Sequence, residues 1–490
     1  AVDAATVCAG GCDYTDLATA IAAAEAGETI TLNEDVTLSS KVVIDEKITL
    51  DLHGFDITGS DQYVLEFNAK DTDFTLTDST ATAGTITGAQ RGILVTAGTL
   101  TLDKVTVTSV DRTIQINPLA DGGAAKVIME GGKVESTGTN ATRTIMLWGN
   151  NIAGNASLVV NGGEIIAPIS SDNSAAINLG SANAAGNTVE INGGAITGHN
   201  GIRLYGNGEL GMTVLTMNGG SVNAVNAGII QSGNDGTENT EIYLYGGSIT
   251  AEPKEGSATV GGDAVAIHHT QSGILVIGKE DGTGPTLTGE TGVALKEGTV
   301  TVNGGTIKAT GEYREVALAR EDGTEDTGAA ISITSNAAFA GGVALTVNGG
   351  TLESANGNAL YEGIAEDEDG TPAALESYVS AIKVDGGSFV GAEGKDSVAA
   401  TAYPEEKFIN GGQFSSDVSK NLTSDVKLVQ DESGNYVVET VDSEITETPS
   451  EPEIENPSTN DNVLTYIVIG LIAVAGIIGT TLYLKKSKVR

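Results

Sequence analysis

A short apolar strand followed by a Gly-Gly pair recurs along most of this chain of 490 residues. The clear copies run from VIMEGGKV at residues 127–134 to KFINGGQF at residues 407–414. One longer interval contains a degenerate copy of the repeat, ILVIGKEDGTGPTL, at residues 274–287. A self-similar unit of about 20–50 residues is typical of solenoids, in which each unit buries its apolar face only against its neighbours. The residues that precede the glycine pairs are Glu130, Asn161, Asn192, Asn218, Tyr245, Asn303, Asn348, Asp385 and Asn410.

The residues around each glycine pair predict strands rather than helices. Val, Leu and Ile alternate with Thr, Asn and Glu, which places the aliphatic side chains on one face of a strand. Glycine tolerates positive φ, so each Asn-Gly-Gly predicts a sharp turn between two strands. With 66 glycines and 4% aromatic residues, the composition fits a repetitive β structure and not an ordinary globular core. A β-propeller stays open as an alternative, although its sequence signature is missing.

The best match to this pattern is an all-β right-handed parallel β-helix with an N-terminal capping helix. Residues 13–27, DYTDLATAIAAAEAG, place Tyr14, Leu17 and Ile21 on one helical face, with Asp13 or Thr15 as the expected N-cap. The chain over residues 5–438 resembles the pectate-lyase-like superfamily, in the form common among surface proteins of gut Firmicutes. The predicted divisions are a cap at 1–29, a β-helix at 30–438, a Pro/Glu-rich linker at 439–461, a transmembrane helix at 462–484 and a cytoplasmic tail at 485–490.

The C-terminus predicts a membrane-inserted end. Residues 463–484 read VLTYIVIGLIAVAGIIGTTLYL, without charge or proline. A transmembrane helix needs roughly 20 apolar residues. Clustered basic residues after such a span hold that end in the cytoplasm, which leaves the rest of the chain outside the cell. The basic residues that follow the span are Lys485, Lys486, Lys488 and Arg490.

A five-residue motif precedes the apolar span. Proline is its second residue and threonine its fourth, and the whole arrangement resembles a cell-wall sorting signal. The resemblance implies that a sortase cleaves between Thr459 and Asn460 and joins the chain to peptidoglycan. Asparagine at both ends is similar to the NPxTN variant read by class B sortases. A permanently retained membrane anchor is the alternative. The motif consists of Asn456, Pro457, Ser458, Thr459 and Asn460.

The charge and the cysteine content restrict the possible binding partners and the cellular compartment of the protein. The formal net charge of −40 leaves no basic patch for phosphates, so we expect no nucleic-acid binding. The start AVDAA is what remains after a signal peptide is removed at a small-residue site, which predicts secretion. The cysteines, Cys8 and Cys12, are separated by three small residues and can pair in an oxidising compartment. No metal site or cofactor is expected.

Candidate catalytic residues are few. Gly198, His199 and Arg203 resemble the Gly-His and Arg motifs of polygalacturonases, but the upstream Asp-Asp dipeptide of those enzymes is missing. We therefore expect His199 and Arg203 to lie on a solvated face. His268 and His269 are adjacent on a predicted strand and point to opposite faces, so they cannot chelate one metal together. Trp148, the single tryptophan, is interpreted as a loop anchor, with stacking on a sugar as the alternative.

Two acidic loops lengthen their coils, at residues 321–326 and 366–370. Asp and Gly in a loop can hold calcium, although neither loop matches a known calcium motif. Loops on a rigid scaffold are also where binding usually occurs, so residues 309–328 and 361–378 are the expected ligand-contact regions. The sequence favours a non-enzymatic, cell-wall-anchored adhesin or surface structural protein that binds a glycan or host matrix ligand. The alternatives are an anchored polysaccharide lyase or glycoside hydrolase, and a coat or spacer without a ligand.

Overall fold

The computed structural model describes residues 5–7, 12–14, 16–119, 123–148, 156–180, 186–205, 212–232, 240–258, 263–318, 327–335, 342–367, 369–372 and 380–441. They belong to the first of two compact units, Ala1–Val441, whereas the second unit is Asp442–Arg490. The predicted sorting motif, transmembrane helix and basic tail lie outside the described residues, as do Cys8 and the side chain of Cys12. Among the described residues, no helix is both long enough and apolar enough to cross a membrane.

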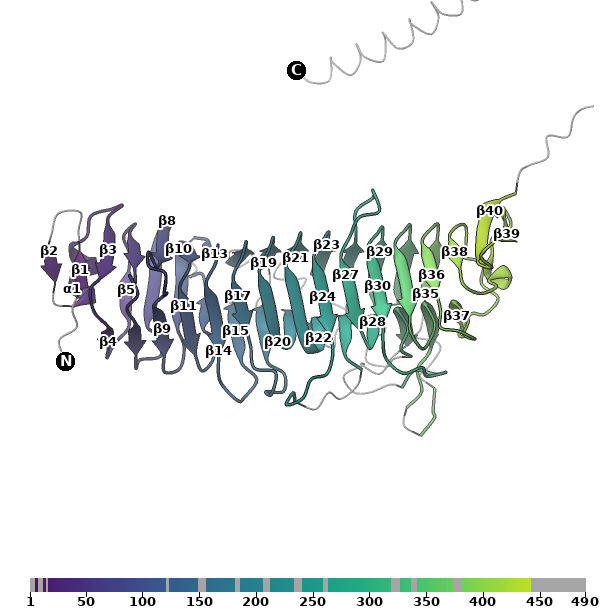
Figure 1. Cartoon of the computed structure of the whole chain (residues 1–490), viewed down its shortest axis with the longest axis horizontal. Helices are drawn as coiled ribbons and strands as arrows, with labels where there is room; N and C mark the ends of the chain where they lie inside the picture. The colour runs from purple at the N-terminus through teal and green to yellow at the C-terminus, as the bar shows by residue number, and fades with distance from the viewer. Residues whose placement is uncertain are drawn as a thin grey trace, which may run out of the picture. The chain divides into compact units, whose positions relative to one another are not determined.

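The first unit is a parallel β-helix-like solenoid, which confirms the predicted all-β repeat fold. Each full coil contributes three short strands, and each strand pairs in parallel with its counterpart one coil away. The strands therefore form three columns that run the length of the unit (Figure 1). This parallel stacking is incompatible with a β-propeller, whose blades are antiparallel.

The first column holds the strands that precede the Gly-Gly turns. Its members are β3 (Thr29–Leu32), β6 (Thr49–Asp51), the end of β8 (Leu65–Thr77), the end of β10 (Ile93–Asp103), β13 (Ala125–Met129), β16 (Ala156–Val160), β19 (Thr188–Ile191), β21 (Thr213–Met217), β23 (Thr240–Leu244), β26 (Gly273–Ile277), β29 (Gly298–Val302), β32 (Val343–Val347) and β35 (Ser380–Val384).

The second column holds the strands that follow those turns. Its members are β4 (Val36–Leu38), β7 (Ile57–Gly59), β9 (Thr85–Gly88), β11 (Thr106–Ser109), β14 (Lys133–Ser136), β17 (Glu164–Ile166), the start of β20 (Ala195–Tyr205), the start of β22 (Ser221–Ser232), β24 (Ser248–Ala251), β27 (Thr286–Gly289), β30 (Thr306–Ala309), β33 (Thr351–Ser354), β36 (Ser388–Val390) and β38 (Gln413–Phe414).

The third column completes each coil. Its members are β5 (Val42–Ile44), the starts of β8 and β10, β12 (Ile114–Ile116), β15 (Arg143–Leu147), β18 (Ala175–Leu179), the ends of β20 and β22, β25 (Val265–His269), β28 (Thr291–Leu295), β31 (Ile331–Ser335), β34 (Leu360–Ile364) and β37 (Val398–Ala400).

The core is a set of aliphatic stacks, because in-register strands repeat the same side chain one coil later. In the first column the buried and less buried residues alternate, as β13 and β16 show. Burying one aliphatic side chain contributes roughly 1.5–3 kcal/mol, so each coil adds several such increments. One stack runs through Phe74, Leu100, Val127, Leu158, Val189, Leu215, Ile242, Leu275, Val300, Leu345 and Ile382.

The Gly-Gly turns need glycine for two different reasons. The second glycine has positive φ, for example 83° at Gly194 and 78° at Gly220, as predicted. The first glycine lies against the turn below it: a Cβ on Gly193 would stand 2.3 Å from the carbonyl oxygen of Asn161. The asparagines add a ladder between coils, since Asn192 Nδ2 donates to Asn161 Oδ1 at 3.0 Å and Asn218 Nδ2 donates to Asn192 Oδ1 at 2.9 Å.

Both ends of the stack are covered by antiparallel elements. At the N-terminal end β1 (Ala5–Val7) pairs with β2 (Cys12–Tyr14) and with β3, and α1 (Leu17–Ala23) buries Leu17, Ala20 and Ile21. The predicted N-caps, Asp13 and Thr15, were wrong: Asp16 caps the helix, accepting from Thr19 N at 2.7 Å. At the C-terminal end η2 (Ser419–Asn421) precedes the hairpin of β39 (Val426–Gln430) and β40 (Tyr436–Thr440), and β40 closes against β38.

Candidate functional site

The two predicted ligand-contact segments come together near the C-terminal end of the solenoid. Residues 309–318 follow β30, and residues 361–367 and 369–372 begin in β34. Leu318 and Glu366 form a parallel bridge, and Glu366 N donates to the carbonyl of Ala317 at 2.9 Å. Ala317, Tyr361 and Ala365 belong to a small buried cluster separate from the main core. The two segments therefore form one packed structure beside the solenoid.

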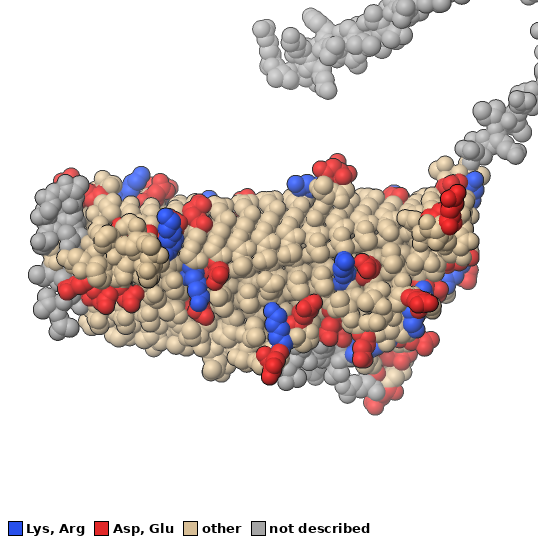
Figure 2. All heavy atoms as spheres, viewed as in Figure 1, with Lys and Arg blue, Asp and Glu red and all other residues tan. Residues whose placement is uncertain are grey.

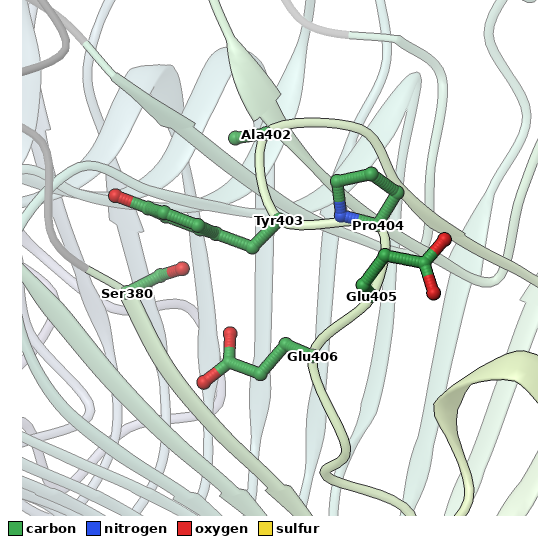
Figure 3. A pocket seen from close by; sticks show the side chains of 6 residues that line it. All are labelled: Ser380, Ala402, Tyr403, Pro404, Glu405 and Glu406. Carbon is green, nitrogen blue, oxygen red and sulfur yellow. The ribbon is translucent and has the colours of Figure 1, made fainter.

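Two cavities open beside these segments, and we call them together the loop site. A cavity of about 330 Å³ is bounded by both segments, and a second of about 470 Å³ lies between β35 and the loop that follows β37 (Figure 3). Ala402 lines both cavities, so they are neighbours. The first is lined by Glu315, Val316, Tyr361, Ile364, Glu366, Pro372, Thr401 and Ala402, and the second by Ser380, Ala402, Tyr403, Pro404, Glu405 and Glu406.

The larger cavity combines an aromatic ring with polar groups. In Figure 3 the side chains of Ser380, Tyr403 and Glu406 reach the same space, whereas the Glu405 carboxylate points away. Beneath them the buried Glu362 accepts from Ser380 Oγ at 3.3 Å and from Ala402 N at 3.2 Å. These two contacts tie β34, β35 and the following loop together, which holds the walls of the cavity in place.

The electrostatic character of the loop site is acidic. Four carboxylates and no Lys or Arg are found among the described residues that line it, so these residues offer acceptors to hydroxyl and ammonium donors. Figure 2 shows acidic side chains gathered over this end of the unit, while the middle of the same face carries few charges. The described part of the chain holds no cluster of three or more metal-ligating side chains. The carboxylates are Glu315, Glu366, Glu405 and Glu406.

The acidic loops predicted as calcium candidates are described only in part. Residues 321–326 and Glu368 lie outside the described residues. In the second loop Asp367 Oδ1 accepts from Asp369 N at 3.0 Å and from Thr371 N at 2.7 Å, next to Gly370 with φ of 76°. Asp367 thus closes its own turn, a common role for an Asp in a loop.

His199 and Arg203 are buried, and the expectation of a solvated face was wrong. Their exposed fractions are 2% and 7%. Arg203 lies in the third column, whose strands such as β18 are buried on both faces, and His199 lies at the corner of β20 just before that column begins. His199 Nε2 lies 3.7 Å from Asp172 Oδ1, yet burial lowers the pKa of His199 more than that carboxylate raises it. The neutral form of the ring is therefore favoured, and among the described residues Asp172 is the carboxylate recorded beside it.

His268 and His269 lie in β25 at adjacent positions, in register with Ala294 and Leu295. Both are buried, and His269 Nδ1 lies 2.9 Å from the carbonyl oxygen of Glu297. The ring of His269 faces the aliphatic interior, so burial lowers its pKa to about 4. These contacts give His269 a structural role.

We predict that His269 makes the protein less stable as the pH falls. The unfolded chain binds a proton near pH 6.5, whereas folded His269 does so only near pH 4, so stability is lost between these values. The unfolding free energy should fall by about 3 kcal/mol more in the native chain than in His269→Asn over that range. The comparison is denaturant unfolding at several pH values, with the exposed His53→Asn as control. Equal slopes for His269→Asn and the native chain would contradict the prediction.

Trp148 is partly exposed and follows β15, where its backbone N donates to Ile116 O at 2.8 Å. The guanidinium carbon of Arg112 lies 5.6 Å from the centre of the tryptophan ring. Sequence reasoning missed this pairing, and it also missed the cavity at residues 380 and 402–406. Neither involves a recognisable motif, since both depend on which coils become neighbours.

Comparisons with known proteins identify no relative. No family model matches the chain, and neither the search of curated proteins nor that of solved structures finds a match.

Proposed function

We propose that this chain is a cell-surface adhesin: a right-handed parallel β-helix of the pectate-lyase-like kind that presents a ligand site on a rigid scaffold. A sortase acting on residues 456–460 joins it to peptidoglycan, and the helix at 462–484 holds it in the membrane before that step. The observation that carries the binding role is the loop site. Two coil-lengthening segments pack together around cavities whose walls are fixed by Glu362 and by strand pairing.

The chemistry of the loop site supports recognition of a hydroxyl-rich ligand. Glycan sites commonly combine an aromatic surface with a few acceptors that fix orientation, and Tyr403, Ser380 and Glu406 provide both. The described residues that line the cavities include no arginine or lysine of the kind that serves as a base in a lyase. The rival, a glycoside hydrolase, draws its support from the same carboxylates, since such enzymes use a pair of them.

A binding screen with the full chain in neutral detergent tests the proposal. Immobilised glycans and matrix proteins should capture the native chain, and Glu406→Gln should weaken capture about tenfold. Glu353→Gln is the matched control, because Glu353 is 46% exposed on the second column, where it faces Lys308. A screen without any ligand would favour a structural coat. Reducing ends or unsaturated products released from pectin, alginate or glycosaminoglycan, and lost in His199→Ala or Arg203→Ala, would establish the enzyme instead.

A further inference from the structure

Three arginines occupy the same register position on successive coils. Arg91, Arg112 and Arg143 each stand two residues before an inward third-column residue, and those residues, Ile93, Ile114 and Ile145, pair in register. Parallel strands are about 4.8 Å apart, so the three α-carbons form a line along the solenoid axis with that spacing. We call the three residues together with Arg203 the arginine row.

Arg203 lies two coils beyond Arg143 but three positions further along the third column, since Arg203 pairs with Asn178 whereas Arg143 pairs with Ala175. β15 pairs with β18, and β18 pairs with β20, which carries Arg203. The row therefore gathers four of the seven arginines of a chain with a net charge of −40. Such a concentration of cations at one place runs against the charge of the rest of the molecule.

The charges of the row are mostly left without a carboxylate. Arg91 Nη1 donates to the hydroxyl of Tyr63 at 2.7 Å. Arg143 Nη1 donates only to backbone carbonyls, those of Ala141 at 2.7 Å, Thr142 at 3.0 Å and Asn173 at 2.7 Å.

Arg203 has a neutral partner, whereas Arg112 lies beside a carboxylate. Arg203 Nη2 donates to Asn173 Oδ1 at 3.1 Å. Among the described residues Asp111 is an acidic neighbour of two of these arginines: Arg112 Nε lies 3.4 Å from its Oδ2, and Arg143 N donates to its Oδ1 at 2.9 Å. The described hydrogen bonds from the guanidinium groups of Arg91, Arg143 and Arg203 thus go to neutral acceptors.

Asn173 holds two of these cations close together. Its carbonyl binds Arg143 and its side chain binds Arg203, and its backbone has a φ of 58°, which L residues seldom adopt. The pKa of Arg143 falls to about 10, chiefly through burial and then through the charge of Arg203. The like charges repel, so an anion placed between them would relieve an existing cost.

Two buried donors beside this pair remain unused. Arg203 Nε and His199 Nε2 have no hydrogen-bond partner among the described residues, and both residues are more than nine-tenths buried. The nearest described carboxylate, that of Asp172, lies 3.7 Å from His199 Nε2 and is exposed. A buried polar group without a partner costs about 1–3 kcal/mol. An anionic ligand oxygen bound here would offset the repulsion between Arg143 and Arg203. It would also accept hydrogen bonds from the two donors.

Aromatic rings flank the row. Arg91 lies 5.2 Å from the ring centre of Tyr63, and Arg112 lies 5.6 Å from that of Trp148. Tyr63 is also fixed from behind, because its hydroxyl donates to Gln115 Oε1 at 2.6 Å. Trp148 is partly exposed and can contact a sugar ring, whereas the buried Tyr63 holds Arg91 in place for an anionic group.

We propose that the arginine row binds a linear sulfated glycan, laid along the solenoid axis. A sulfate ester keeps its charge at every physiological pH, and its oxygens point in several directions. Guanidinium groups that approach from successive coils suit such a group better than a planar carboxylate, which a single arginine fork satisfies. The inference rests on the proposed adhesin role and names a ligand class for it. The surface of the arginine row shares no lining residue with the loop site.

The fluorescence of Trp148 can report binding to the arginine row, because Trp148 is the only tryptophan of the chain and contacts Arg112. The full chain in neutral detergent is titrated with a heparin octasaccharide, and a saturable change of tryptophan fluorescence is expected. Arg143→Gln should weaken binding about tenfold. Arg91→Gln should weaken it too, and added salt should lower the affinity of the native chain. Lys308→Gln, on the second column, is the charge-matched control.

Three outcomes would overturn the inference. Unchanged affinity in both Arg91→Gln and Arg143→Gln, with native unfolding midpoints, would place binding elsewhere. Equal affinity for an oligogalacturonate of the same length would show that sulfate is not selected. The third outcome is that heparin causes no response, while another ligand is captured and Glu406→Gln abolishes that capture. This result would contradict glycan binding by the arginine row but would still support the adhesin role.

Discussion

Gly132→Ala is expected to lower the unfolding free energy by about 4 kcal/mol or more. Gly132 joins β13 to β14 with a φ of 81°, which disfavours any side chain. A Cβ at this position would also stand 2.2 Å from the carbonyl oxygen of Val105 and 2.8 Å from its nitrogen. That oxygen accepts from Lys133 N at 2.9 Å, so the turn cannot move away without breaking a bond between coils.

Gly256→Ala separates the cost of a positive φ from the cost of a clash with the neighbouring coil. Gly256 has a nearly equal φ of 79°, but nothing lies within 4 Å of its added Cβ. Its replacement should cost only about 1 kcal/mol, the expense of the left-handed backbone alone. Denaturant unfolding followed by circular dichroism measures both variants. Similar losses in the two proteins would show that close stacking of the coils contributes little.

Phe389→Ala is expected to cost about 3–5 kcal/mol. Phe389 in β36 is fully buried, and its ring stacks on that of Phe414 with centres 4.8 Å apart and planes at 17°. These rings fill the last coil beneath the C-terminal hairpin, where few other groups are available to refill a cavity. The loss should appear as a lower midpoint in the same unfolding experiment.

Val390→Ala is the matched control for that variant. Val390 follows Phe389 on the same strand, points outward and is 39% exposed. Its truncation should change the unfolding free energy by less than about 0.5 kcal/mol. An equal effect of the two substitutions would contradict the inward and outward assignment of this strand.

The repeat architecture could be predicted because its cause is local. Each Gly-Gly pair marks a turn, and the alternating aliphatic residues beside it mark the buried face, as the stack from Val127 to Ile382 confirms. The helix at the N-terminal end was also predictable from its apolar face. Its cap was not, because Asp13, Thr15 and Asp16 are chemically similar candidates and only the final geometry selects Asp16.

The environment of His199 and Arg203 could not be predicted from alternation. Alternation assumes one solvated face for each strand, whereas the third column is buried on both faces. The arginine row was hidden for a related reason. Arg91 and Arg112 are 21 residues apart and Arg112 and Arg143 are 31 apart, because the turns differ in length. Their shared position becomes visible only once the strand register is known.

The loop site was predicted in part. The segments at 309–328 and 361–378 were singled out because they lengthen their coils, and their described residues do pack together. The contribution of Ser380, Tyr403 and Glu406 came from a later coil. No composition signal marks those residues, since a stack of coils brings together segments that are distant in sequence.

The proposed anchoring of this protein to the cell wall is tested most directly at its C-terminus. The chain is released from the cell wall by muralytic digestion, and its C-terminal peptide is identified by mass spectrometry. We predict a peptide that ends at Thr459 and carries a wall fragment on that carbonyl. A C-terminal peptide that continues through Asn460 into the apolar segment would contradict sortase anchoring.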